Sequence, residues 1–348
     1  MPSVLDKLRK NSTIELTSVL TESKFFEEKD VIHLPVPMMN VAFSGLLEGG
    51  MTPGLTMFAG PSKHFKTLFS LVCAKAYMDK YEEAALLFYD SEFGTPKSYF
   101  ESLGIDMDRV VHTPITDVEQ LKFDLVNQLK ELSRDERVVI VIDSIGNLAS
   151  KKEVEDAENQ KSVADMSRAK ALKSMFRIVT PHLTLKNIPL IAVNHTYKEI
   201  SMFPKDIVGG GTGSYYSADN IFIIGRQQEK EGTEITGYNF ILRVEKSRYV
   251  REKSAIPITV TFDSGISKWS GLLEVALLSG HVIKPKNGWY ASVDPETGET
   301  SDNYRLKDIQ NDEFWQPILA SESFQRYVKN AYQVSSNNLL NDNEEDDE

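Results

Sequence analysis

The stretch GPSKHFKT, residues 60–67, has the residue types of a phosphate-binding loop. In the usual pattern, G-x-x-x-x-G-K-[ST], backbone N–H groups surround the phosphates, the lysine reaches the terminal phosphates and the hydroxyl binds Mg²⁺. Gly60, Lys66 and Thr67 fit this pattern, but Phe65 stands where the second glycine is expected. Glycine there permits a backbone conformation that a side chain resists. The segment alone is therefore consistent with a nucleotide site or with an ordinary N-capped helix after a strand.

Polar residues follow three further apolar runs and could serve the same chemistry. Asp143 ends VIVID and could hold the water shell of Mg²⁺, and Glu92 follows LLFYDS and could deprotonate an attacking water. Asn194 and His195 follow IPLIAV. Each has an ordinary alternative as a helix cap, a surface acid or a structural histidine. Four such strand ends at one edge of a parallel sheet are hard to obtain by accident, because ligands bind at that edge.

The elements that would position these residues alternate along the chain. Apolar, strand-like runs cover residues 55–60, 84–92, 137–147, 188–196, 220–225, 238–248 and 255–265. Apolar residues at three- and four-residue spacing predict a helix over 118–132, and another is expected over 66–81. Alternating strands and helices predict an α/β fold with a mostly parallel sheet and right-handed crossovers. Two short helical patterns, over 4–10 and 14–24, are too short to bury much alone.

Composition narrows the class of protein. The chain has 348 residues with a net charge of −12, which argues against a protein that coats nucleic acid by charge alone. The single cysteine excludes an internal disulfide and predicts a reducing compartment. The first residues lack the apolar run of a signal peptide, and no stretch approaches the length of a membrane span. These features predict a soluble intracellular protein.

Changes of character along the chain predict four parts. We expect an N-terminal helical segment over 1–30, a core of alternating strands and helices over 31–267 and a small C-terminal domain over 268–335. The last part, 336–348, has six acids in its final eight residues, a composition typical of a disordered tail.

Taken in order, these motifs resemble those of RecA-type recombinases, and most closely the UvsX-type recombinases of tailed bacteriophages. The matching stretches cover nearly the whole chain and include FYDSEFG, IDSIGNLASKKE, GGGTG, SADNIFIIG, VEKSR and KPKNGWY. Phenylalanine at the glycine position of the loop is a variant of that phage branch. The resemblance implies a RecA-like P-loop ATPase core with a small N-terminal helical segment and a small C-terminal domain.

The same resemblance implies ATP and Mg²⁺ as cofactors and assigns a role to each residue. Thr67 and Asp143 would hold Mg²⁺, and Tyr99 would stack on adenine. His195 stands where bacterial RecA has the glutamine that senses the γ-phosphate. The implied nucleotide-contacting residues are Gly60, Pro61, Ser62, Lys63, His64, Phe65, Lys66, Thr67, Tyr99, Asp143 and Asn194. The implied catalytic residues are Glu92, Lys66, His195, Lys246 and Arg248.

Two segments match DNA-binding loops, about 150–163 and about 197–217. The second combines lysines and aromatic residues with GGGTG, which suits a loop that orders on a phosphate backbone and inserts apolar groups between bases. Its predicted DNA-binding residues are Lys198, Phe203, Lys205, Gly209, Gly210, Gly211, Thr212 and Gly213. The first has four acids against three lysines, so a solvated lid is its alternative.

Lys246 and Arg248 have two interpretations. They could protect an edge strand against aggregation. In the resembling family, basic residues here reach the γ-phosphate bound to the neighbouring subunit, in a head-to-tail arrangement that generates an open helix. The N-terminal segment, including Phe25 and Phe26, would then dock on the adjacent protomer, or it would cap its own domain.

The predicted function is that of a DNA-dependent ATPase and recombinase in phage recombination, replication and repair, acting in the cytoplasm of the bacterial host. It would form helical filaments on single-stranded DNA and promote pairing and strand exchange with double-stranded DNA. Further implied partners are a single-stranded DNA-binding protein and a loading mediator of the UvsY type. The alternatives are a ring-forming motor that shares Lys66, Asp143 and Glu92, and a regulatory protein switched by ATP without DNA.

Overall fold

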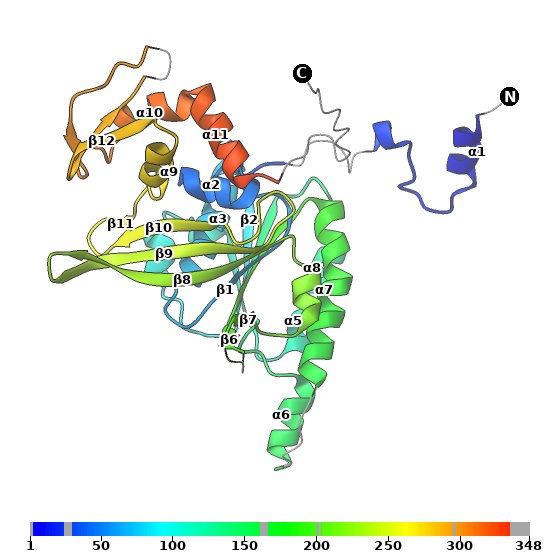
Figure 1. The fold of residues 1–348 in the computed structure, drawn as a ribbon. Helices are drawn as coiled ribbons and strands as arrows, with labels where there is room; N and C mark the ends of the chain where they lie inside the picture. The colour runs from blue at the N-terminus through cyan, green and yellow to red at the C-terminus, as the bar shows by residue number, and fades with distance from the viewer. Residues whose placement is uncertain are drawn as a thin grey trace.

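The computed structural model describes residues 3–23, 30–160, 166–199, 202, 204–294 and 297–334. Its largest sheet consists of β1 (Gly54–Ala59), β2 (Ala85–Asp90), β3 (Val110–Pro114), β4 (Val138–Asp143), β5 (Pro189–Asn194), β8 (Asn220–Glu231), β9 (Glu234–Lys246), β10 (Ala255–Thr261) and β11 (Gly265–Ile266). The spatial order is β11-β10-β9-β8-β1-β5-β4-β2-β3 (Figure 1). Neighbours from β8 to β3 are parallel, and those from β8 to β11 are antiparallel. The predicted α/β fold with a mostly parallel sheet is confirmed.

Helices cover both faces of the parallel strands. One apolar core lies between the sheet and the helices α2 (Pro37–Ser44) and α3 (Lys66–Lys80). A second core, on the opposite face, includes residues of α5 (Val118–Glu131) and α7 (Ser167–Lys186). The central strands β1 and β5 are buried along their whole length, as their continuous apolar sequences indicate.

The register of the parallel strands brings the predicted polar residues to one edge. Asp90 pairs with Asp143 across β2 and β4, and Ala59 pairs with Asn194 across β1 and β5. Ile142 pairs with Ala192 across β4 and β5, so the four strands end within one residue of one another and the segments after them share one edge of the sheet.

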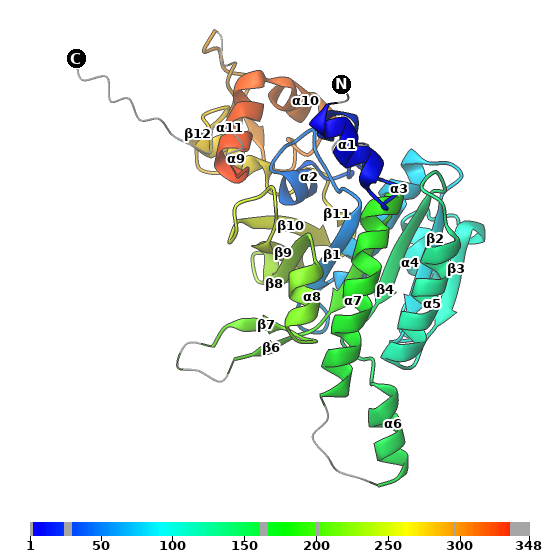
Figure 2. The same ribbon diagram turned by 90° about the vertical axis from the view of Figure 1, so that its right-hand side faces the viewer.

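Smaller elements surround that edge. They are α4 (Lys97–Ser102), α6 (Lys151–Glu158), β6 (Thr196–Lys198), β7 (Asp206–Val208) and α8 (Thr212–Ser217). The 3₁₀ turn η2 (Met107–Arg109) leads into the start of β3 and lies at the opposite edge. Figure 2 shows α6 and the β6–β7 hairpin projecting away from the sheet on the same side of the molecule. These two projections belong to the segments that the sequence analysis predicts to be DNA-binding loops.

The C-terminal part forms a second, smaller layer. It contains α9 (Leu272–Leu278), β12 (Val282–Lys286), β13 (Trp289–Ser292), β14 (Tyr304–Arg305), α10 (Asp312–Ala320) and α11 (Glu322–Tyr332). Its three strands form an antiparallel sheet, and the buried Trp315 stacks on Trp269 with ring centroids 6.3 Å apart. The four-part division of the chain stays a prediction.

The N-terminal segment differs from what the sequence predicts. The helix α1 (Val4–Asn11) forms, with Ser3 and Asp6 in a reciprocal capping box. The second predicted helix, over 14–24, is wrong: residues 14–19 are not helical, and only the 3₁₀ turn η1 (Leu20–Glu22) follows. Several β-branched and hydroxyl residues in this stretch disfavour a helix that has no apolar surface to pack against. Phe25 and Phe26 lie outside the described residues.

Candidate active site

The loop between β1 and α3 has the backbone shape of a phosphate cradle. Lys63 and Phe65 both adopt left-handed conformations, each with φ 61°. Within the described part of the chain, the N–H groups of residues 62–65 donate to no backbone acceptor. Lys66 is only 7% exposed, and its Nζ donates to the carbonyl oxygen of Pro61 at 2.8 Å. Free N–H groups at the start of a 15-residue helix, with a lysine above them, fit a phosphate group.

Phe65 adopts the left-handed backbone conformation that a glycine at this position would adopt, and packing of its ring stabilises that conformation. Its ring stacks on Phe240 of β9, with centroids 4.8 Å apart, and meets Phe69 of α3 edge-on at 5.9 Å. The left-handed conformation costs of order 1 kcal/mol, and burial of an aromatic ring offsets that amount. The irregular residue is therefore compatible with the loop shape.

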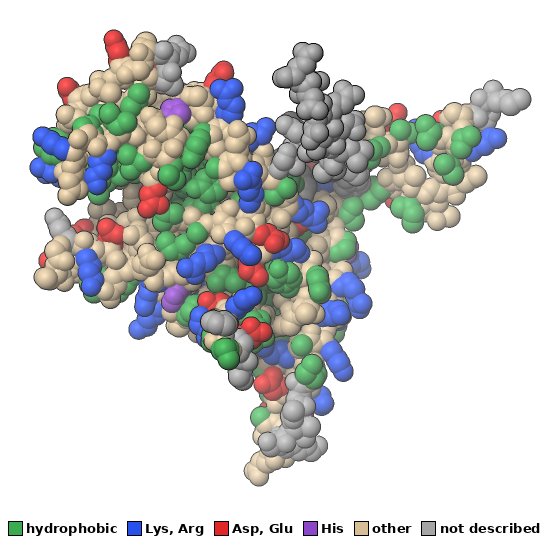
Figure 3. Space-filling model, in the orientation of Figure 1, with side chains coloured by type: hydrophobic (Ala, Val, Ile, Leu, Met, Phe, Trp, Pro, Cys, Tyr) green, Lys and Arg blue, Asp and Glu red, His purple; other side chains and the backbone are tan. Residues whose placement is uncertain are grey.

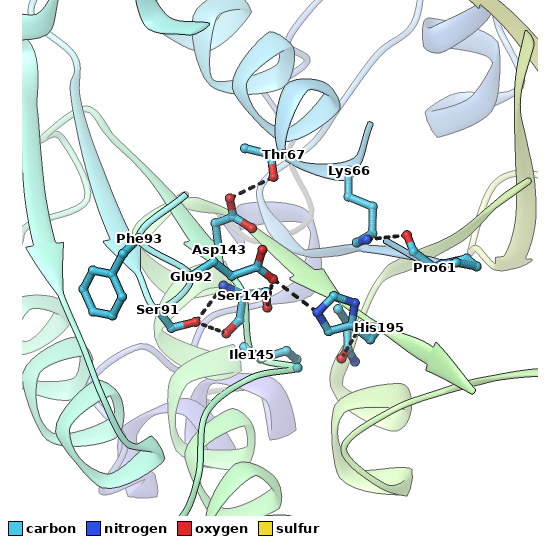
Figure 4. Close-up of polar contacts among 12 residues, drawn as sticks. Pro61, Lys66, Thr67, Ser91, Glu92, Phe93, Asp143, Ser144, Ile145 and His195 are labelled. Atoms are coloured by element: carbon cyan, nitrogen blue, oxygen red, sulfur yellow. Dashed lines mark hydrogen bonds and ion pairs between the residues drawn. The ribbon is translucent and has the colours of Figure 1, made fainter. Parts of the chain in front are cut away.

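Thr67 and Asp143 form an oxygen-rich corner at the base of the loop. The Thr67 hydroxyl donates to Asp143 Oδ2 at 2.8 Å (Figure 4). The Thr95 hydroxyl donates to the same oxygen at 3.2 Å. Burial raises the pKa of Asp143 to about 6. Its other oxygen, Oδ1, is buried and finds no hydrogen-bond partner among the described residues. Because hard cations prefer carboxylate and hydroxyl oxygens, this donor set fits Mg²⁺.

Glu92 lies opposite this corner, just past the end of β2. Its Oε1 accepts hydrogen bonds from the Ser144 hydroxyl at 2.8 Å and from His195 Nε2 at 3.2 Å (Figure 4). The hydrogen bond from His195 is the main cause that lowers the pKa of Glu92. The carboxyl group is therefore ionised at neutral pH and held in one orientation.

His195 and Asn194 connect this site to the loop that follows β5. A Cβ atom at Gly146 would lie 2.4 Å from His195 Cδ2, so glycine at 146 is needed for the position of that ring. The carbonyl oxygen of His195 accepts from Gly209 N at 2.9 Å, and Asn194 Nδ2 donates to Gly209 O at 2.8 Å. The buried amide of Asn194 is therefore engaged with the loop and does not line the cavity described next.

A cavity of about 640 Å³ brings most of the predicted residues together. The predicted residues that line it are Ser62, Lys63, His64, Phe65, Lys66, Thr67, Glu92, Tyr99, Asp143 and His195. Sequence reasoning missed a second wall, which consists of Arg226, Tyr238, Phe240 and Phe262. The Arg226 guanidinium lies 4.8 Å from the Tyr238 ring centroid and donates to Lys63 O at 3.1 Å. Only the alternation of Tyr238 and Phe240 on one face of a strand could have indicated this wall.

Lys246 and Arg248 lie away from the cavity of their own chain. Lys246 Nζ donates to the carbonyl oxygens at the end of α8, those of Tyr215 at 2.9 Å, Tyr216 at 3.1 Å and Ala218 at 2.7 Å. Arg248 Nε lies 3.1 Å from Asp219 Oδ1. The edge-strand interpretation is wrong, because β9 lies between β8 and β10.

The second predicted DNA loop exposes apolar groups but has a paired lysine. Tyr197 is 56% and Met202 is 90% exposed, whereas Lys198 forms a 2.8 Å ion pair with Asp206. Lys205 is exposed, and Phe203 lies outside the described residues.

The glycines that follow are needed for backbone shape. Gly210 and Gly211 have φ 87° and 76°. A Cβ atom at Gly213 would lie 2.7 Å from Lys173 Cα, so α8 approaches α7 closely there. Thr212 is the first residue of α8. Gly210, Gly211 and Gly213 therefore shape the loop, and contact of residues 209–213 with DNA stays a prediction.

The first predicted loop is partly helical. Ser150 caps α6 through a reciprocal bond with Glu153, and residues 161–163 lie outside the described part.

Figure 3 shows basic and acidic side chains interspersed on the face drawn. No described helix is long and apolar enough to cross a membrane.

Comparisons with known proteins agree with this geometry. Residues 33–267 match the family described as the RecA N-terminal domain, and residues 269–328 match the C-terminal domain of the bacteriophage T4 recombination and repair protein. The recombination and repair protein of Enterobacteria phage T4 is 53% identical over 341 residues, which cover 97% of this chain and 87% of that protein.

Bacterial RecA proteins are more distant relatives. RecA of Synechococcus sp. strain CC9902 is 26% identical over 271 residues, covering 77% of this chain and 70% of that protein. RecA of Symbiobacterium thermophilum is 25% identical over 279 residues, covering 78% and 77%. The matched region contains the loop, the strand ends and the cavity. The chain therefore belongs to the RecA family and is a RecA-type recombinase.

Proposed function

We propose that this recombinase hydrolyses ATP with Mg²⁺ in the cavity beside residues 60–67 and that single-stranded DNA stimulates the reaction. The observation that carries the proposal is the convergence of Lys66, Glu92, Asp143 and His195, from four segments far apart in sequence, around one cavity of about 640 Å³. A phosphate cradle, a metal corner and an ionised carboxylate are the parts that phosphoryl transfer to water requires.

The loop and the metal corner would bind the nucleotide. The N–H groups of residues 62–65 and the Lys66 ammonium would hold the phosphates, and Lys66 would exchange the Pro61 carbonyl for a phosphate oxygen. Thr67 and Asp143 would hold Mg²⁺, which when bound neutralises charge on the phosphates. Tyr99 and the wall around Tyr238 and Phe262 offer aromatic surfaces for the base.

Glu92 would accept the proton of the attacking water. Ser144 and His195 both bind its Oε1, so its Oε2, which has no hydrogen bond within the described residues, is free to take that proton. The lowered pKa of Glu92 keeps it ionised, and a fixed orientation compensates for its weaker basicity.

His195 supports a link between the nucleotide and the second DNA loop. Its ring contacts Glu92, and its carbonyl oxygen contacts Gly209 at the start of the GGGTG segment. A nucleotide that displaces the ring would also shift the backbone of the loop. Tyr197 and Met202, both exposed, suit insertion between bases, whereas Lys198 and Lys205 suit the backbone phosphates.

Surfaces that no described residue covers support assembly with further copies. The strand β3 is at the edge of the sheet and exposes Val111. The helix α1 buries no residue and exposes Val4, Leu5 and Leu8. A head-to-tail contact through these surfaces would generate a filament and present Lys246 and Arg248 to the nucleotide of a neighbour. A single-stranded DNA-binding protein and a loading mediator remain proposed partners of that filament.

The test is ATP hydrolysis by the wild-type protein and by Lys66→Ala, each with and without single-stranded DNA. We expect DNA to stimulate the wild-type rate and the variant to lose at least about 100-fold, because the phosphates lose their clamp. Lys75→Ala is the matched control: it lies on the same helix and pairs with Asp79 at the surface.

The outcome separates the alternatives. A wild-type rate that ignores DNA would contradict the recombinase mechanism and favour an ATP-switched regulator. Rings of fixed size without DNA would favour a motor, whereas assemblies whose length follows the DNA agree with the proposal.

A further inference from the structure

Asp90, the last residue of β2, is a buried carboxylate to which the reaction outlined above gives no task. It is 4% exposed and pairs in the sheet with Asp143. A buried charge is costly unless hydrogen bonds satisfy it. The partners of its two oxygens therefore indicate what keeps it there.

One oxygen of Asp90 holds the backbone that carries Glu92. Oδ1 accepts from Glu92 N at 3.1 Å and from Phe93 N at 2.8 Å. An aspartate that bonds to N–H groups two and three residues ahead closes a tight turn. Phe93 has φ 52°, a left-handed conformation that a bulky residue adopts only when the surroundings impose it.

This turn sets the direction in which Glu92 points. Figure 4 shows Phe93 directed away from the side on which Glu92 faces His195. If the two N–H groups were released, Phe93 could return to an ordinary conformation, and the Glu92 carboxylate would no longer be held against Ser144 and His195.

The other oxygen of Asp90 ties the turn to the edge of the sheet. Oδ2 lies 3.2 Å from Nε2 of His112 on β3, and this imidazole is half exposed. The His112 ring stacks on Phe88 at 5.9 Å, beside a hollow of about 390 Å³ that Phe93 and Phe100 also line. Asp90 therefore lies between the edge strand and the Glu92 turn.

We propose that Asp90 is a positioning residue for Glu92: its carboxylate fixes the turn at 91–93 and so aims the Glu92 side chain at the water-binding side of the cavity. The inference rests on the proposed role of Glu92 as the base. His112 steadies Asp90 from β3. Asp90 itself contacts no substrate in this arrangement.

The first experiment measures hydrogen exchange of the Glu92 and Phe93 amides in the full-length protein, which does not depend on activity. In Asp90→Ala both amides should exchange at least about 10-fold faster than in the wild type, because their acceptor is removed. In Asp90→Asn the amide oxygen still accepts, so protection should stay within about 3-fold. Unchanged protection in Asp90→Ala would overturn the proposal.

The second experiment measures DNA-stimulated hydrolysis and the binding of a fluorescent ATP analogue. Asp90→Ala should lower kcat by about 10-fold or more while KM and the affinity for the analogue change less than about 2-fold. Asp90→Asn should keep kcat within about 3-fold of the wild type. The kcat of this variant still tests the proposal if Asp90→Ala does not fold. A large loss of kcat in Asp90→Asn, or equal losses of kcat and affinity in Asp90→Ala, would overturn the proposal.

Asp117→Ala is the matched control. Asp117 is also buried and also bonds to a backbone N–H, that of Gln120 at 2.8 Å, but it caps α5 away from Glu92. This variant should lose stability and keep its kcat. A wild-type protein without DNA-stimulated hydrolysis would overturn the proposed function, and the exchange rates would still decide whether Asp90 holds the turn.

Discussion

The cavity proposed to bind ATP and the elements proposed to face DNA share one edge of the sheet and differ in how their functional groups are engaged. Around the cavity, Thr67 bonds to Asp143, and Ser144 and His195 bond to Glu92, all within one chain. Beside it, the basic groups are engaged internally: Lys198 with Asp206, Lys246 with the end of α8, and Arg248 with Asp219. Under the proposed function, hydrolysis would need little rearrangement within a protomer, whereas contacts with DNA and with a neighbour would require these internal bonds to be exchanged.

The largest expected effect tests whether the chain's own Lys246 serves another protomer. Lys246→Ala should lower DNA-stimulated hydrolysis by about 100-fold, because a cation at the transferring phosphate is lost. Nucleotide binding by isolated protomers should change little, since Lys246 does not line their own cavity. Lys230→Ala, on the exposed end of β8, is the control. Equal losses in both assays would contradict the interface assignment and remove the distinction between the two regions.

An intermediate effect concerns the metal corner. The pKa of Asp143 is raised to about 6, so its carboxylate is present above that pH and takes up a proton below it. Mg²⁺-dependent binding of an ATP analogue should therefore weaken by up to about 10-fold per pH unit below pH 6.

The nucleotide also titrates in this range, so the quantity to compare is the affinity ratio of wild type to Asp143→Asn. That ratio should fall toward 1 as the pH falls from about 7.5 to about 5. A ratio that is constant with pH would show that the corner does not use the Asp143 carboxylate.

The smallest expected effect sharpens the DNA side of the comparison. Asp206→Asn removes the partner of Lys198 and leaves the β6–β7 pairing intact. Affinity for single-stranded DNA should rise by about 2- to 3-fold and the salt dependence should steepen, because one more cation becomes available to phosphates. Asp206→Asn combined with Lys198→Ala should lose the gain. An unchanged affinity in the single variant would mean that Lys198 does not contact DNA.

The sequence predicts the parallel sheet and its shared edge because strand-like runs and their polar ends are local signals. Helices over Lys66–Lys80 and Val118–Glu131 follow their predicted ranges within one residue. The packing of Phe65 against Phe240 could not be predicted, since the two residues meet only in the folded sheet. The helix predicted over 14–24 has no surface to pack against among the described residues. The low helix propensity of its residues therefore determines that this stretch does not form a helix.

The site shows the same division between local and long-range information. The roles proposed for Lys66, Thr67 and Glu92 follow from short motifs, whereas the internal contacts of Lys246 join β9 to residues at the end of α8, 28 to 31 positions earlier in the chain. Asp90 also has a local signal in the sequence: an aspartate two residues before Glu92, at a strand end, is typical of a turn.

The central claim is that each ATP site is complete in one chain except for the Lys246 that a neighbouring protomer supplies. In the most direct test of this claim, two inactive variants are mixed. Glu92→Gln protomers lack the base and Lys246→Ala protomers lack the cation, but a mixed filament contains interfaces with both groups intact. An equal mixture on single-stranded DNA should recover roughly a quarter of the wild-type rate, because random assembly forms one such interface in four. A mixture no more active than its components would contradict the account, since both groups would then act within the same protomer.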